Sequence, residues 1–144
     1  MTATYILFTV AGTTYAIRSE QVLHIEMVEQ VTPVPNAPTF VEGVVFSRGH
    51  VVPVLNLRAR FGFERAPLDL RTRLVVVLAE GRRVGLMVDE AREFVTIADA
   101  SIQQPNLAIE GLSGNYLQGV VILGERIVMI LDIREVVGTA PLAA

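Results

Sequence analysis

The sequence predicts an all-β protein made of two tandem copies of one small, strand-rich unit. Three observations support this prediction. Short β-branched runs recur along the chain between turn residues, a segment of the first half is repeated in the second half, and helical content looks low. Hairpins at such regular spacing are typical of small barrels or sandwiches rather than of a parallel sheet alternating with helices.

Four β-hairpins are expected, each formed by two apolar runs that are joined by a glycine-containing turn. The first hairpin turns at Ala11-Gly12-Thr13, and the others turn around Gly49, Gly81 and Gly124. The expected strand pairs are residues 5–10 with 14–17, 44–46 with 51–55, 74–78 with 84–88, and 120–123 with 127–131.

Helices are expected only as short segments of one or two turns, at residues 56–61, 98–103 and 132–137. Asn56 and Asp132 are candidate N-caps, because a short side-chain oxygen can accept a hydrogen bond from the free amides at a helix start.

An internal repeat is the most informative feature of the chain. Residues 40–58 align with residues 116–134 without a gap at a constant offset of 76, and six of the nineteen positions are identical. One shared position is Gly43/Gly119, where glycine permits a bulge or a close backbone approach. A weaker match pairs residues 15–25 with 84–94 at an offset of 69.

The repeat divides one domain, residues 1–137, into units of about residues 1–65 and 70–137, joined by the segment 65–69. Units this small are marginal alone, so we expect them to pack through an apolar interface that leaves a groove at their junction. The loop 99–115 is expected to be exposed, and the tail 138–144 is expected to be disordered.

Composition excludes several classes of protein. Hydrophobic residues make up 51% of the chain, charged residues 19%, and the mean hydropathy is +0.49, so the chain as a whole is not disordered. No apolar stretch approaches the length of a spanning helix, and no secretory signal is evident at the N-terminus. The twelve basic residues are all Arg and are scattered at a net charge of −3, which argues against nucleic acid binding. A cytosolic protein fits best.

A search for catalytic or metal-binding residues finds no convincing site. Without Cys there are no disulfides and no thiolate sites. His24 and His50 lie in different hairpins, neither beside a second candidate ligand. The adjacent acids Asp89 and Glu90 face opposite ways on a strand and more plausibly mark a turn, and Glu26 is read as a solvated charge. We therefore expect no enzyme, no metal and no cofactor.

A protein-binding surface remains as the hypothesis. Arg48 lies at the tip of the first repeat's hairpin, where the second repeat has Gly124. An arginine at a turn is commonly just a solvated side chain. A difference between the copies at a tip is nevertheless what one copy with its own partner contact would show.

Several spaced motifs resemble the CheW-type chemotaxis coupling proteins. In the first half they are Val22-Leu-His-Ile25, VTPVPNAPTFVEGV at 31–44 and RGHVVPVLNLR at 48–58. In the second half they are VGLMVD at 84–89, YLQG at 116–119 and ILDI at 130–133. The likeness covers about residues 4–137, with the motifs in the order of the family.

The resemblance implies two tandem five-stranded SH3-like β-barrels with short helical turns, in a non-enzymatic cytoplasmic adaptor. That adaptor couples the cytoplasmic signalling tip of chemoreceptors to the regulatory domain of a CheA-type histidine kinase. The resemblance also implies that a receptor helix enters the groove between the barrels. Neither nucleic acid nor direct insertion into the membrane is expected.

Site residues are implied by matching positions. The receptor side comprises Val22 and Ile25 for apolar burial, Gly43 for close approach and Arg48 as a polar anchor. The kinase side uses the strand edge and loops of the second barrel, with Gly85 and Val88 as members.

Four positions depart from the family pattern. Phe46-Ser47 stands where the family usually has Asn-Leu, His24 stands where an acidic residue is common, and Asn56 stands where Asp is common. The fold is unaffected, but the pathway stays open: the chain could serve a non-flagellar system, such as twitching motility or surface sensing. A stand-alone regulatory SH3-like barrel that binds a ligand is a further alternative.

Overall fold

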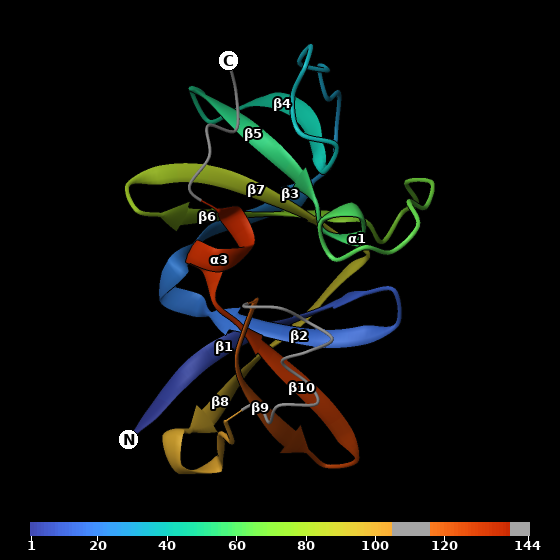
Figure 1. The fold of residues 1–144 in the computed structure, drawn as a ribbon. Coiled ribbons are helices and arrows are strands. Elements are labelled where there is room, and N and C mark those ends of the chain that lie inside the picture. The colour runs from blue at the N-terminus through green and yellow to red at the C-terminus, as the bar shows by residue number, and fades with distance from the viewer. Residues whose placement is uncertain (105–115, 139–144) are drawn as a thin grey trace.

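The all-β prediction is confirmed by a computed structural model, which describes residues 1–104 and 116–138 (Figure 1). The strands are β1 Thr2–Val10, β2 Thr13–Arg18, β3 Val22–Met27, β4 Val41–Ser47, β5 His50–Asn56, β6 Arg73–Ala79, β7 Arg82–Val88, β8 Glu90–Ala98, β9 Leu117–Leu123 and β10 Arg126–Leu131. The helices are short: the 3₁₀ turns η1 Ser19–Gln21 and η2 Asp99–Ser101, and the α-helices α1 Leu57–Arg60 and α3 Ile133–Val137.

The strands form two five-stranded sheets. Sheet A has the order β8-β1-β2-β10-β9, and sheet B has the order β3-β6-β7-β5-β4. Neighbouring strands are antiparallel except for the pairs β2–β10 and β5–β7, which are parallel. Figure 1 shows sheet B in the upper half of the molecule and sheet A in the lower half.

Each repeat contributes strands to both sheets, which corrects the predicted division into barrels at residues 1–65 and 70–137. The first repeat places β1 and β2 in sheet A but β3, β4 and β5 in sheet B, and the second repeat does the reverse. Replacing each strand of sheet B by its counterpart in the other repeat reproduces the order of sheet A. Similarity between repeats cannot reveal this exchange, because it depends on pairing between strands far apart in sequence.

Neither sheet is closed by backbone hydrogen bonds within the described residues. The strands β3 and β4 are the two edges of sheet B, and β8 and β9 are the two edges of sheet A. The two expected five-stranded units are therefore present, while any closure into SH3-like barrels depends on side chains.

Buried side chains form three clusters. On β6, Val75 and Val77 belong to the largest cluster, whereas Leu74 and Val76 belong to a smaller one confined to sheet B, as alternation along a strand requires. The largest cluster draws on both sheets and on α1 and α3, and a third cluster belongs to sheet A. The junction between the sheets is thus a packed core, which corrects the expectation of an open groove there. Each small sheet needs an apolar face covered, and the other sheet covers it.

The four predicted hairpins and two N-caps are confirmed. The Asn56 side chain accepts a hydrogen bond from the Ala59 amide at the start of α1, and Asp132 accepts one from the Arg134 amide at the start of α3. The expected helix at 98–103 is only the 3₁₀ turn η2. Of the predicted exposed loop and disordered tail, residues 105–115 and 139–144 lie outside the described residues.

Repeat-equivalent residues meet where α1 approaches α3. The guanidinium of Arg60 lies 4.3 Å from the ring centre of Phe40 and 5.1 Å from that of its counterpart Tyr116. Its Nε also donates to the carbonyl of Val136 at 2.8 Å. Arg60 therefore ties the two repeats together through cation–π contacts and a hydrogen bond.

No helix among the described residues is long and apolar enough to cross a bilayer.

Candidate functional site

The two predicted receptor residues on β3 form a half-buried apolar strip. Val22 pairs with Val77 and Ile25 pairs with Val75 on β6, and both partners belong to the core between the sheets. A register shift between Val22 and His24 puts the two side chains on one face despite their spacing. Both pack partly against that core, so only their outer portions are open to a partner.

The opposite face of β3 carries a polar cluster that sequence reasoning missed. His24 Nε2 lies 2.9 Å from Glu26 Oε2 and 3.2 Å from Ser47 Oγ, and Ser47 Oγ donates to Glu26 Oε2 at 2.9 Å. We call His24, Glu26 and Ser47 the seam cluster, because it joins the edge strands β3 and β4 of sheet B. The predictions that His24 has no neighbouring ligand and that Glu26 is solvated are wrong. His24 and Ser47 are 23 residues apart, and only the curling of the sheet brings them together.

The seam cluster has the composition of a hydrolytic triad but not its geometry. In a triad the histidine bridges, with one ring nitrogen on the acid and the other on the nucleophile. Here the same Nε2 faces both Glu26 and Ser47, and the Ser47 hydroxyl donates directly to the carboxylate. Ser47 is also 6% exposed, which leaves no access for a substrate. The arrangement is a structural contact.

Arg48 follows Ser47 at the exposed tip of the β4–β5 hairpin. Ser47 pairs with His50, so the turn has two residues, Arg48 with φ +47° and Gly49 with φ +83°. Two left-handed residues are the pattern of a type I′ turn, in which a non-glycine residue at the first position is strained. Among the described residues Arg48 has no hydrogen bond or ion pair, so its charge is free to meet a partner.

The difference between Arg48 and Gly124 has a backbone explanation as well. In the equivalent β9–β10 turn, Gly124 has φ +64° while Glu125 is not left-handed. The two hairpins therefore use different two-residue turns, and glycine moves from the second position to the first. The divergence at the tip does not by itself indicate a contact.

Gly43 serves a contact within the chain. A Cβ at this position would lie 2.1 Å from the carbonyl oxygen of Thr32, and the backbone φ is +147°. Thr32 and Val44 exchange two hydrogen bonds of 2.8 Å along the outer edge of β4. Gly119 occupies the same place in sheet A, beside the bridge between Gln103 and Val120. The close approach expected of Gly43 is thus made by residues 32–33.

Gly85 and Val88, predicted on the kinase side, lie inside the protein. Both are on β7, a central strand that pairs with β5 on one side and β6 on the other. Val88 is 1% exposed, and a Cβ on Gly85 would lie 2.8 Å from the Leu74 side chain. Neither position offers a side chain to a partner, and β7 is not the strand edge that the resemblance implied.

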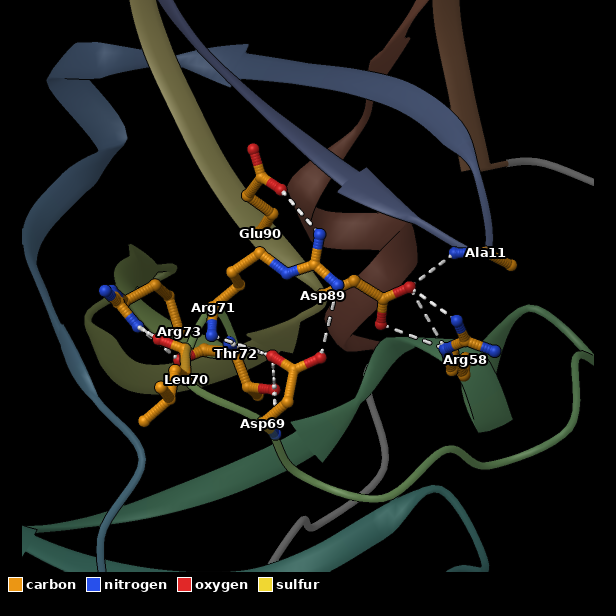
Figure 2. A network of polar contacts seen from close by, with 9 residues as sticks. All are labelled: Ala11, Arg58, Asp69, Leu70, Arg71, Thr72, Arg73, Asp89 and Glu90. Carbon is orange, nitrogen blue, oxygen red and sulfur yellow. Dashed lines mark hydrogen bonds and ion pairs between the residues drawn. The ribbon is translucent and has the colours of Figure 1, made fainter.

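Asp89 connects the two sheets at the point where β7 leads into β8 (Figure 2). Its carboxylate accepts from the Ala11 amide at 2.8 Å and from Nε and Nη2 of Arg58 at 2.9 and 2.7 Å. This hydrogen bonding with Asp89 raises the pKa of Arg58 above its usual value. Glu90, the residue after Asp89, points instead toward the Arg71 guanidinium, 3.9 Å away. The prediction that these adjacent acids face different ways is confirmed, but they stand at the passage from β7 to β8 rather than at a turn.

Asp69 organises the turn before β6 in the same network (Figure 2). Its carboxylate accepts from the backbone amide of Arg71 at 2.7 Å and from that of Thr72 at 3.2 Å. The bond to the Arg71 amide holds the pKa of the Asp69 carboxyl below its usual value.

Exposed apolar pairs occupy equivalent places on the two edge hairpins. Phe46 pairs with Val51 across β4–β5, and the two residues are 77% and 67% exposed. Ile122 pairs with Ile127 across β9–β10, and each is 57% exposed. Paired apolar side chains on an outer sheet face are candidates for protein contact.

A cavity of about 400 Å³ lies beneath the segment 65–68, lined by Glu29, Val31, Glu42, Asn56 and Met87. Asn56 Nδ2 donates to Glu42 at 2.8 Å, and Glu42 also pairs with Arg65. No group of three or more His, Cys, Asp or Glu side chains in the described ranges could hold a metal ion.

Comparisons with known proteins agree with this arrangement. Residues 4–140 match the model of the CheW-like domain. The chain is 33% identical over 141 residues to chemotaxis protein CheW of Klebsiella aerogenes, covering 96% of this chain and 84% of that protein. It is 30% identical over 131 residues to chemotaxis protein CheW of Bacillus subtilis, covering 91% and 84%. The crystal structure of scaffolding protein TtCheW from Thermoanaerobacter tengcongensis superposes with a TM-score of 0.88 at 24% identity, over 96% of this chain and 90% of that one.

Proposed function

Because this chain belongs to the CheW family of chemotaxis adaptors, which are not enzymes, we propose that it couples chemoreceptors to a CheA-type histidine kinase. On this proposal one surface binds the cytoplasmic signalling tip of a receptor, and another binds the regulatory domain of the kinase. Both partners act in the cytoplasm, at receptor arrays. The family match over nearly the whole chain supports the adaptor role. The exposed surfaces at the two ends of the molecule support separate binding sites for the receptor and the kinase.

The receptor side uses the β3 strip and the Arg48 tip. The observation that carries it is the seam cluster: it ties the strand bearing Val22 and Ile25 to the residue that precedes Arg48. Since the junction between the sheets is filled, the receptor helix lies along its outer margin, over the open portions of Val22 and Ile25. Arg48 then meets an acidic group of the helix. Gly43 contributes by allowing residues 32–33 to pack against β4.

The kinase side uses the exposed edge of sheet A. The hairpin β9–β10 offers the apolar pair Ile122 and Ile127 at the opposite end of the molecule from β4 (Figure 1). Gly85 and Val88 act in this proposal only from within the core, by holding β7 against its neighbours.

Pull-down with purified fragments tests the two surfaces separately. We expect Arg48→Ala to weaken binding of a receptor signalling tip by about 30-fold, the effect of losing about 2 kcal/mol at a central contact, while kinase binding is unchanged. Ile122→Ser should show the reverse pattern. Arg134→Ala removes another exposed arginine and serves as the matched control. Failure of the unaltered protein to bind either fragment would overturn the proposal.

A regulatory barrel for a small ligand is a second candidate, favoured only by the cavity beneath residues 65–68. Thermal stabilisation by a small molecule in the absence of any protein partner would support it. No stabilisation across a metabolite library, together with receptor and kinase binding, would reject it.

A further inference from the structure

The seam cluster is placed where sheet B lacks backbone pairing. Its members come from β3 and β4, which stand at opposite ends of the strand order yet approach each other because the sheet curls. The side chains of His24 and Glu26 are 13% and 29% exposed. Ser47 is the most buried member at 6% exposed, and a buried hydroxyl is stable only when its hydrogen bonds are satisfied. No unpaired buried side-chain polar atom occurs among the described residues.

A count of hydrogen-bond donors and acceptors indicates the role of His24 Nε2 in the seam cluster. The ionised Glu26 carboxylate can only accept, and the single Ser47 hydroxyl proton is directed to Glu26 Oε2 at 2.9 Å. His24 Nε2 lies 2.9 Å from the same oxygen, a distance that two acceptors would not tolerate without a proton between them. With Glu26 ionised, this geometry places a proton on Nε2.

The seam cluster of sheet B has a weaker counterpart at the equivalent place in sheet A. Glu93, which matches His24 at the offset of 69, lies on the edge strand β8 and pairs with Arg126 of β10 at 3.0 Å. That pair also links the two ends of its sheet, from the edge strand β8 to the β9–β10 hairpin at the other edge. Its side chains are 53% and 40% exposed, so water screens it and it contributes little. Both sheets thus carry a polar bridge across the seam, but only the bridge in sheet B is shielded.

We propose that the seam cluster is a positioning device for receptor recognition: it holds the Arg48 tip at a fixed distance from the apolar strip of β3. This inference rests on the proposed function and deepens it. His24 lies between Val22 and Ile25 in the chain, and Ser47 immediately precedes Arg48. A receptor helix that must meet both features binds more tightly when they are already in place, because less freedom is lost on binding. None of the three cluster residues needs to touch the receptor.

Two substitutions of His24 distinguish the effect of its hydrogen bond to Glu26 from the effect of its side-chain volume. His24→Gln keeps a side-chain amide that can donate to Glu26, whereas His24→Leu fills the space and leaves Glu26 with one partner fewer. We expect His24→Leu to weaken receptor-tip binding about tenfold and to leave binding of the kinase regulatory domain unchanged. The His24→Gln variant should retain most of the receptor affinity of the unaltered protein. Ser47→Ala, a smaller change, should give a loss of several-fold. Arg126→Ala breaks the counterpart bridge in sheet A and should leave receptor affinity unchanged.

Two measurements on the free protein are independent of the receptor. Nitrogen-15 NMR of His24 should show the proton on Nε2, and amide exchange at residues 46–50 should quicken in Ser47→Ala but not in Arg126→Ala. Wild-type receptor affinity in both His24→Leu and Ser47→Ala, or a neutral His24 with its proton on Nδ1, would overturn the inference. If the unaltered protein binds no receptor tip, the proposed function fails, whereas the NMR and exchange results still decide whether the cluster positions the tip.

Discussion

Gly43 offers the sharpest test of whether a predicted site residue serves packing within the chain, because its counterpart Gly119 provides a control in the same protein. In Gly43→Ala the new methyl group would lie 2.1 Å from the Thr32 oxygen and 3.0 Å from Pro33 Cα, both backbone atoms that cannot rotate away. Relief requires residues 32–33 to leave the edge of β4, which breaks both hydrogen bonds between Thr32 and Val44.

The expected loss follows from these contacts. Two hydrogen bonds at about 1 kcal/mol each, plus about 1–2 kcal/mol for alanine at a φ reserved for glycine, sum to roughly 3–4 kcal/mol. For a chain of this size that corresponds to a fall in Tm of about 10 °C. In Gly119→Ala the nearest atoms are Ile102 Cγ2 at 2.5 Å, on a stiff β-branched side chain, and the Gln103 backbone oxygen at 3.3 Å, but φ is not left-handed. We expect a smaller loss there, of about 1–2 kcal/mol.

Thermal and urea unfolding followed by circular dichroism measure both variants. If Gly43→Ala melts within about 2 °C of the unaltered protein, or if the two glycines prove equally sensitive, the chain does not use Gly43 for its own packing. The receptor contact implied by the family resemblance would then be the better explanation of this glycine.

Three further predictions follow from the topology and the polar network. Fragments 1–65 and 70–144 should each lack β-sheet circular dichroism, since neither contains a complete sheet, and mixing them should restore it; a folded single fragment would contradict the strand exchange. Asp89→Asn should lower the unfolding free energy by about 2 kcal/mol in urea titrations, because the Arg58 guanidinium loses its charged acceptor, while Glu90→Gln should change it by less than about 0.5 kcal/mol; equal effects would count against the Asp89 link. Because the folded-state pKa of Asp69 is depressed, its carboxylate stabilises the protein above the unfolded-state pKa and that contribution is lost as pH falls through the folded-state pKa. Asp69→Asn should accordingly lower Tm at neutral pH but not in acid, and a deficit independent of pH would refute this reasoning.

Local features were predictable from the sequence because they depend on neighbouring residues. The four hairpins follow from apolar runs around glycine turns, and the caps at Asn56 and Asp132 follow from a short polar side chain before a helical turn. Strands β3 and β8 were harder to recognise, since each pairs only with a strand far along the chain.

The candidate site residues also divide into those whose environment was predictable from neighbouring residues and those whose environment depends on the tertiary structure. The exposure of Arg48 was predictable, because a charged residue at a turn is exposed wherever the hairpin lies. Val88 looked like any other valine of a strand, and only its place on the central strand β7 shows that it is buried on both sides. The seam cluster had no signal in the sequence, because nothing in the spacing of His24 and Ser47 indicates that two edge strands approach each other.

The amino-acid sequence by itself determined that this protein is all-β, duplicated and built from hairpins, since β-branched patterning and turn chemistry act over a few residues. The tertiary structure alone decided which hairpin joins which sheet, how the junction is filled, and which polar side chains meet across an open seam. Those outcomes depend on burying apolar faces that no single repeat can cover, and on contacts between residues that the chain itself keeps far apart.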